Sequence, residues 1–160
     1  MRVLFLGRGN DCRTLLAEAV FNHLAPPGCT AHRASCDGAC PPDPAALALL
    51  EQQHIRLPPA PESPMSEEAI EDDVLITVCS VGAERTCPCC RQAGLRADWG
   101  VHDPSHRRMR SRERDTELLD VYHILRARVQ RFLDLIQAGT ATDDPERLQR
   151  ELTRIGRYLP

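Results

Sequence analysis

The sequence lacks lysine and has no surplus of positive charge. All 20 of its basic residues are arginines, and 23 acidic residues leave a formal net charge of −3 and an isoelectric point near 6.1. A protein whose main partner is a nucleic acid usually carries a basic surface. The composition therefore argues against nucleic acid as the main partner.

The sequence also lacks a long apolar run. No segment approaches the roughly 20 apolar residues of a membrane-spanning helix, so we expect no membrane partner. The first apolar run starts at Val3, directly after Met1 and Arg2, which leaves no room for a secretory signal peptide. We therefore expect a cytoplasmic protein.

Cysteine, in contrast, is abundant, with eight residues in 160. In a short secreted chain this number would suggest a disulfide scaffold, but a chain without an export signal is expected to keep its thiols reduced. We therefore expect thiols that serve catalysis or metal binding.

The length and the hydrophobic pattern predict one α/β domain. A chain of 160 residues, 42% of them hydrophobic, can bury one core and is too short for two ordinary domains. Short apolar runs predict strands at 3–6, 29–35 and 73–79. Helical periodicity, with Asp43 and Pro44 as a start signal, predicts helices at 14–24, 43–54 and 116–137.

A further helix is predicted near the C-terminal end. Asp143, Asp144 and Pro145 form a helix-start sequence. The apolar residues that follow at helical spacing are Leu148, Leu152, Ile155 and Leu159. We divide the chain into a main domain at 1–138 and a helical extension at 139–160. The extension is expected to bury this stripe against the domain or against a second copy in a homodimer.

The stretch from Val3 to Ala19 predicts an oxyanion cradle, because a buried strand breaks into a glycine-bearing turn that opens a helix. Loop amides and the first helical turn present free N–H groups and the positive end of the helix dipole. Arg13 adds a forked guanidinium that suits a tetrahedral oxyanion. The predicted cradle consists of Gly7, Arg8, Gly9, Asn10, Asp11, Cys12, Arg13 and Thr14.

The sequence of this loop also allows other interpretations. A dinucleotide fingerprint would need a third glycine where Cys12 stands, and no acidic residue follows at the usual interval. Residue by residue, Arg13 could be a surface arginine, Cys12 a buried small hydrophobe and Asn10 a turn residue. Their joint occurrence at fixed spacing after a buried strand favours the cradle.

The loop resembles the phosphate loop of the low-molecular-weight protein tyrosine phosphatase superfamily, C-x-G-N-x-C-R-S/T. Residues 9–14 follow that pattern, but Gly7 stands where the superfamily has its nucleophilic cysteine. The resemblance implies a three-layer α/β fold with a four-stranded parallel sheet flanked by helices, here with an extra C-terminal helix. Because Gly7 supplies no thiolate, such a loop can bind an oxyanion without attacking it.

A second region, residues 79–104, resembles the thioredoxin-coupled arsenate reductases of the same superfamily, which share a Cys-loop-Cys-Pro and a W-G-x-x-D-P motif. The resemblance implies arsenate or phosphate as ligand and thioredoxin as partner. By position, Cys79 and Cys87 match the second and third cysteines of the family's relay, which form a disulfide that thioredoxin reduces. Asp103 matches the general acid, and Arg13 matches the anion clamp.

Some residues depart from the family pattern. Cys89 and Cys90 add thiols after Cys87, and the resulting cluster could hold arsenite, copper(I) or zinc, although it lacks the paired C-x-x-C spacing of a structural zinc site. No cofactor is required. Asp11 would oppose a dianion unless its side chain points outward.

Three functional interpretations stay open from the sequence. The first is an arsenate reductase that has lost its nucleophile. The second is a pseudoenzyme that binds an oxyanion or a thiophilic metalloid as a sensor, carrier or scaffold. The third, a low-molecular-weight tyrosine phosphatase, ranks lower because Cys79 and Cys87 have no task in phosphate hydrolysis.

Overall fold

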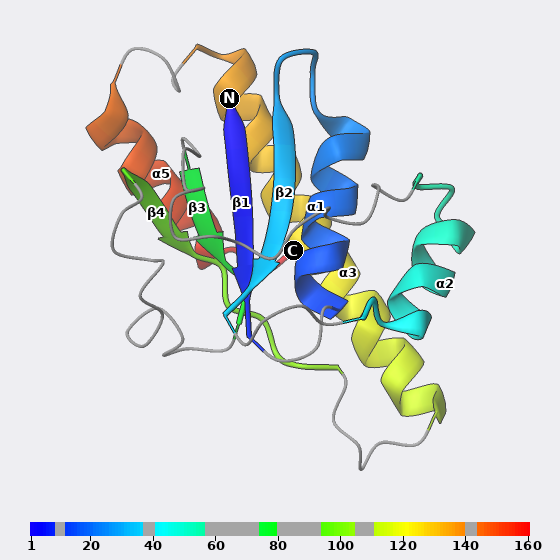
Figure 1. Cartoon of the computed structure of the whole chain (residues 1–160). Helices are drawn as coiled ribbons and strands as arrows, with labels where there is room; N and C mark the ends of the chain where they lie inside the picture. Colours follow the sequence, from blue (N-terminus) through cyan, green and yellow to red (C-terminus); the bar gives the residue numbers. More distant parts are fainter. Residues whose placement is uncertain (9–11, 37–40, 57–73, 80–93, 105–110, 140–143) are drawn as a thin grey trace.

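A four-stranded parallel sheet forms the centre of the computed structural model, which describes residues 1–8, 12–36, 41–56, 74–79, 94–104, 111–139 and 144–160. The strands are β1 (Arg2–Gly7), β2 (Thr30–Ser35), β3 (Val74–Thr77) and β4 (Leu95–Asp98). Their order is β2-β1-β3-β4, with every neighbouring pair parallel (Figure 1). The predicted fold class is confirmed.

Both faces of the central strands are buried, which explains their continuous apolar sequence. On one face, Val3 and Phe5 of β1 join Val74 and Ile76 of β3 in the main hydrophobic cluster. The side chains that alternate with them, among them Leu6, are equally buried. The runs predicted at 3–6 and 73–79 are therefore strands, although the second ends earlier, at Thr77.

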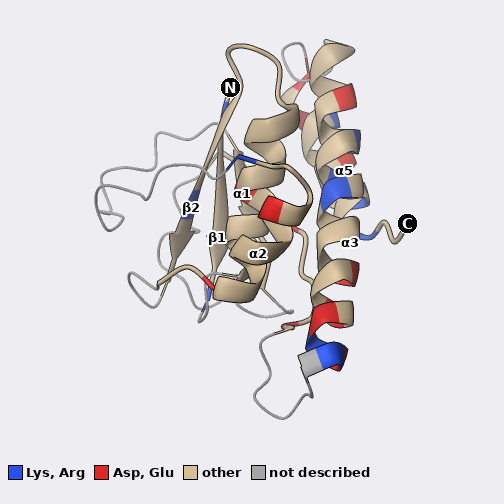
Figure 2. Cartoon of the chain, turned by 90° about the vertical axis from the view of Figure 1, so that its right-hand side faces the viewer, with Lys and Arg blue, Asp and Glu red and all other residues tan. Residues whose placement is uncertain are grey.

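Four described helices pack with the sheet: α1 (Cys12–Leu24), α2 (Pro44–Gln52), α3 (Ser111–Gln137) and α5 (Pro145–Gly156). In Figure 2, α3 lies beside α1, on the side of α1 that faces away from β1 and β2, and its charged residues lie mainly on its outer side. None of the described helices combines the length and the apolar character that crossing a membrane requires.

Helix α3 begins five residues before the predicted start at residue 116. Its first turn carries arginines and acidic residues, which are good helix formers but show no apolar periodicity. An ion pair secures this end, because Arg114 Nη2 lies 2.7 Å from Asp43 Oδ2. Asp43 also caps α2 by accepting hydrogen bonds from the backbone N–H groups of Ala45 and Ala46, as its sequence predicted.

Helix α5 packs into the same core as the rest of the domain. Its N-cap is Asp144, and Leu148, Leu152 and Ile155 are buried in the main cluster, largely beside β4. Leu159 is an exception to the predicted stripe, since it follows the end of the helix and is 68% exposed. The stripe is thus buried within the chain, which gives no support to a homodimer through this surface.

Candidate oxyanion site

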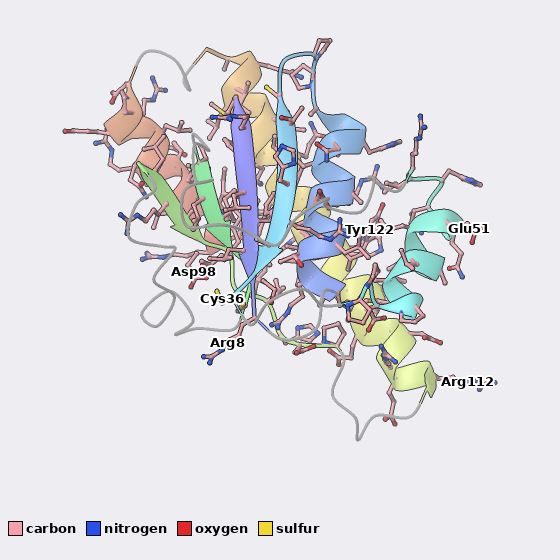
Figure 3. The ribbon with its side chains drawn as sticks, in the orientation of Figure 1. Arg8, Cys36, Glu51, Asp98, Arg112 and Tyr122 are labelled. Atoms are coloured by element: carbon pink, nitrogen blue, oxygen red, sulfur yellow. The ribbon has the colours of Figure 1, made fainter. Side chains whose placement is uncertain are left out.

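The carboxyl ends of the strands bring the candidate residues to one edge of the sheet. Parallel strands end at a common edge, and ligands of open α/β sheets bind there. Beyond β3 the backbone continues beside β1, with Val78 N donating to Leu6 O at 3.0 Å. Figure 3 shows Arg8, Cys36 and Asp98 together at this edge. The prediction that Gly7 and Cys79 end at the same edge is confirmed.

Arg13 lies at the start of α1 and is buried, with 5% of its surface exposed. Both arms of its guanidinium have partners in the segment after β4. Nη1 donates to the carbonyl of Val101 at 3.1 Å, and Nη2 donates to Asp103 Oδ2 at 3.3 Å. Two residues 90 positions apart, both predicted for the site, therefore form an ion pair.

Cys79 places a thiol beside this clamp. It is 6% exposed, and its sulfur accepts a hydrogen bond from the backbone N–H of Arg8 in the loop after β1. Burial raises the pKa of the Cys79 thiol, while the charge of Arg13 and the Arg8 amide act in the opposite direction. Cys79 is therefore a protonated thiol at neutral pH.

Cys12, the thiol within the predicted cradle, is even less reactive. It is 1% exposed, and burial, assisted by the nearby carboxylates of Asp43 and Asp103, raises its pKa to about 12. Only the thiolate is a nucleophile. The interpretation of Cys12 as a buried small hydrophobe accounts for what the structure shows.

Gly7 ends β1 at the focus of the site and has no room for a side chain in the present arrangement. A Cβ atom at this position would lie 2.6 Å from Cγ2 of Thr14, closer than carbon atoms approach without strain. Thr14 is itself buried on the first turn of α1. Its methyl group thus lies against the point where a nucleophilic side chain would begin.

The segment at 98–103 is held by contacts that explain its W-G-x-x-D pattern. Trp99 is fully buried and donates from Nε1 to the carbonyl of Leu152 at 3.0 Å. Gly100 must lack a side chain, because a Cβ atom there would lie 2.6 Å from the carbonyl oxygen of Cys79. Asp98 Oδ1 accepts from the Gly100 N–H at 2.9 Å.

Two residues of this site were missed from the sequence. Arg128, 3% exposed, donates from Nη1 to the carbonyl of Trp99 at 2.7 Å and from Nε to that of Tyr158 at 3.1 Å. Its position three residues after Leu125, on the buried side of α3, was the available signal. Cys36 places a third thiol at the edge, where its N–H donates to the Gly7 carbonyl at 3.0 Å.

The remaining predicted site residues, Gly9, Asn10, Asp11, Cys87, Cys89 and Cys90, lie outside the described residues. The disulfide between Cys79 and Cys87 and the thiol cluster at 87–90 therefore stay predictions. Within the described ranges, no group of three or more histidine, cysteine or acidic residues could hold a metal ion.

Comparison with known proteins decides the family. The sequence profile of the family described as low molecular weight phosphotyrosine protein phosphatase matches residues 2–151. This chain belongs to that family. No curated protein matches it. The phosphatase family profile thus covers all four strands and extends into α5.

Solved structures share the phosphatase-family fold at low sequence identity. Arsenate reductase from Archaeoglobus fulgidus is 23% identical, with a TM-score of 0.58 over 80% of this chain and 98% of that one. The thioredoxin-dependent arsenate reductase of Corynebacterium glutamicum is 20% identical, with a TM-score of 0.65 over 86% of this chain and 62% of that one. An arsenate reductase in the phosphate binding state is 21% identical, with a TM-score of 0.61 over 86% of this chain and 97% of that one.

Proposed function

We propose that this chain is an arsenate reductase-like protein that binds arsenate or phosphate and does not turn it over. The observation that carries the proposal is Gly7, which stands where the family pattern has its nucleophilic cysteine. The Thr14 methyl group also lies against the point where that side chain would begin. The site lacks a thiolate at its focus but keeps its basic clamp.

Binding would rest on Arg13 and on the start of α1. The guanidinium offers forked N–H donors, and the first helical turn adds the positive end of the helix dipole. Cys12 and Cys79 have raised pKa values, so neither thiol places a negative charge beside an incoming anion at neutral pH. Among the described residues, the site can therefore hold an oxyanion without offering a thiolate to attack it.

Cys79 favours arsenate over a phosphorylated protein as the ligand. Hydrolysis of a phosphoester needs no second thiol, whereas reduction of arsenate to arsenite needs thiols that supply two electrons. All three of the similar structures described above carry the name arsenate reductase, one of them thioredoxin-dependent. Thioredoxin is accordingly the proposed reductant of a Cys79–Cys87 disulfide that forms when arsenate accepts two electrons from the thiols, a step that needs a nucleophile at position 7. For the chain with Gly7, a sensor, carrier or scaffold role is the proposed biological setting.

Titration calorimetry with sodium arsenate and sodium phosphate tests the binding proposal. The unmodified chain is expected to bind both anions. Arg13→Met removes the guanidinium but keeps an apolar stem, and is expected to weaken binding at least about tenfold, since losing one partner of a buried charged pair is costly.

Arg126→Met is the matched control, because Arg126 is exposed on α3 and donates only to the Tyr122 hydroxyl among the described contacts. This variant is expected to bind both anions like the unmodified chain. Binding that is unchanged in Arg13→Met, or absent from the unmodified chain, would refute the proposal.

A further inference from the structure

The clamp that would hold the anion already holds a carboxylate. Arg13 Nη2 donates to Asp103 Oδ2 at 3.3 Å, and Nη1 donates to the Val101 carbonyl at 3.1 Å. Because the Arg13 side chain is only 6% exposed, the guanidinium has little freedom to turn toward another partner. An anion that reaches Arg13 must therefore lie beside the Asp103 carboxylate.

Asp103 is itself held in place. The neighbouring His102 Nε2 lies 2.5 Å from Glu117 Oε2 of α3, and Val101 and Pro104 on either side are buried. The segment is thus tied to α1 through Arg13 and to α3 through Glu117. These contacts keep the carboxylate close to the clamp when a ligand approaches.

Among the described residues, two ion pairs lie at or near the clamp. Arg13 is paired with Asp103, and Arg114 is paired with Asp43 at 2.7 Å. The thiols of Cys12 and Cys79 are neutral at neutral pH. A fully deprotonated dianion would meet the Asp103 carboxylate as a like charge, which is unfavourable in a partly buried site.

An anion that keeps a proton can offset this repulsion with a hydrogen bond. Hydrogen phosphate and hydrogen arsenate carry an O–H that can donate to the Asp103 carboxylate, while their other oxygens accept from Arg13. Sulfate has the same tetrahedral shape and carries no proton at neutral pH. Bound sulfate would therefore screen the partly buried Asp103 carboxylate from water without donating to it, which disfavours a ligand that lacks the O–H group.

We propose that Asp103 is a specificity-determining residue that makes the site select protonated tetrahedral oxyacids, such as hydrogen phosphate and hydrogen arsenate, over aprotic ones such as sulfate. This inference rests on the proposed function, because it presumes that an oxyanion binds at Arg13. It assigns to Asp103 a role in equilibrium binding, which is separate from the proton transfer that the family resemblance implies.

Calorimetric titration with sodium phosphate and sodium sulfate, each at constant ionic strength and neutral pH, tests the inference. The unmodified chain is expected to bind phosphate at least about tenfold more tightly than sulfate, a modest ratio for this mechanism because the Asp103 side chain is 32% exposed. Asp103→Asn exchanges the carboxylate for a neutral amide of the same shape. The ratio of its phosphate affinity to its sulfate affinity is expected to fall toward one, mainly because this variant binds sulfate more tightly than the unmodified chain does.

Asp115→Asn is the matched control. It removes a carboxylate from the exposed face of α3 and leaves Glu117, Asp103 and Arg13 in place, so the ratio of phosphate to sulfate affinity should stay that of the unmodified chain. Asp103→Ser, which also lacks the carboxylate, provides a second variant if Asp103→Asn fails to fold.

An affinity ratio near one in the unmodified chain, or a ratio unchanged in the folded Asp103 variants, would overturn the inference while leaving the proposed function intact. Absence of any anion binding by the unmodified chain and the Asp103 variants would overturn both.

Discussion

At the scale of single residues, the site differs from a catalytic one in the state of its thiols. Cys12 and Cys79 are both close to Arg13, yet burial raises the pKa of each. A nucleophilic cysteine needs the reverse, a pKa lowered by a helix start or a cationic neighbour. Gly7, which stands where the family pattern has its nucleophilic cysteine, carries no thiol.

The raised pKa of Cys12 predicts a specific pH dependence of stability. Burial raises this pKa from 9.0 to about 12, so the folded chain keeps a proton that the unfolded chain loses above pH 9. The resulting stabilisation is complete below pH 9 and is lost as the pH rises toward 12, at roughly 1 kcal/mol per pH unit.

Urea unfolding at several pH values between 8 and 11 measures this effect. The free energy of unfolding of Cys12→Ala is expected to fall less steeply above pH 9 than that of the unmodified chain. Cys29→Ala, at a partly exposed thiol, serves as the control and should keep the original slope. Equal slopes for Cys12→Ala and the unmodified chain would contradict the account.

At the scale of elements, the helices and strands that have a clear local sequence signal were predicted. Strands β1 and β3 have continuous apolar runs, α2 has an Asp-Pro start, and α1 and α3 have helical periodicity. Strand β4 has only four residues, two of them charged, so no pattern marked it. It forms because its backbone pairs with β3, where Thr77 lies opposite Asp98, a tertiary effect that local propensity does not reveal.

The contacts of the site likewise fall into two groups: those that a sequence pattern indicates and those that only the fold reveals. Arg13 and Asp103 were predicted together because a family pattern names both. Arg128 was not, because a single arginine on a helix usually faces solvent, and its acceptors are backbone carbonyls that no side-chain pattern indicates. The ion pair between Arg13 and Asp103 also depends on the fold, since the two residues are 90 positions apart in the sequence.

Arg128→Met is expected to destabilise the chain. The variant leaves the buried carbonyl of Trp99 and the carbonyl of Tyr158 without their donor, at a cost of about 2–4 kcal/mol in the free energy of unfolding. Chemical denaturation monitored by Trp99 fluorescence provides the measurement. The exposed Arg126→Met should change the value by less than about 1 kcal/mol, and a similar small effect for Arg128→Met would contradict the assigned role.

At the scale of the whole molecule, α5 connects the C-terminal region to the site. Its Leu152 is fully buried and its carbonyl accepts from Trp99, whose segment also carries Asp103. The sequence predicted the buried stripe but left open what it packs against. The answer required the three-dimensional position of β4, which the sequence alone did not define.

Leu152→Ala should therefore lower the free energy of unfolding by about 2–5 kcal/mol, because it leaves a cavity between α5 and the sheet. Leu159→Ala is the matched control, since Leu159 is 68% exposed and its truncation should change stability by less than about 0.5 kcal/mol. Thermal unfolding of both variants distinguishes them. Equal melting temperatures would show that α5 contributes little to the core.

The central claim is that the chain binds its anion but cannot attack it. The most direct measurement is the rate of arsenate reduction coupled to thioredoxin, thioredoxin reductase and NADPH, for the unmodified chain, Gly7→Cys, and Gly7→Cys combined with Thr14→Ser. The second substitution removes the methyl group that would lie 2.6 Å from the new Cβ. We expect no turnover by the unmodified chain, weak turnover by the single variant and the highest rate for the double variant.

Loss of a covalent nucleophile costs roughly a million-fold in rate in a comparable enzyme, so the contrast is expected to be large. Arsenate reduction by the unmodified chain at a rate near that of the double variant would contradict the claim.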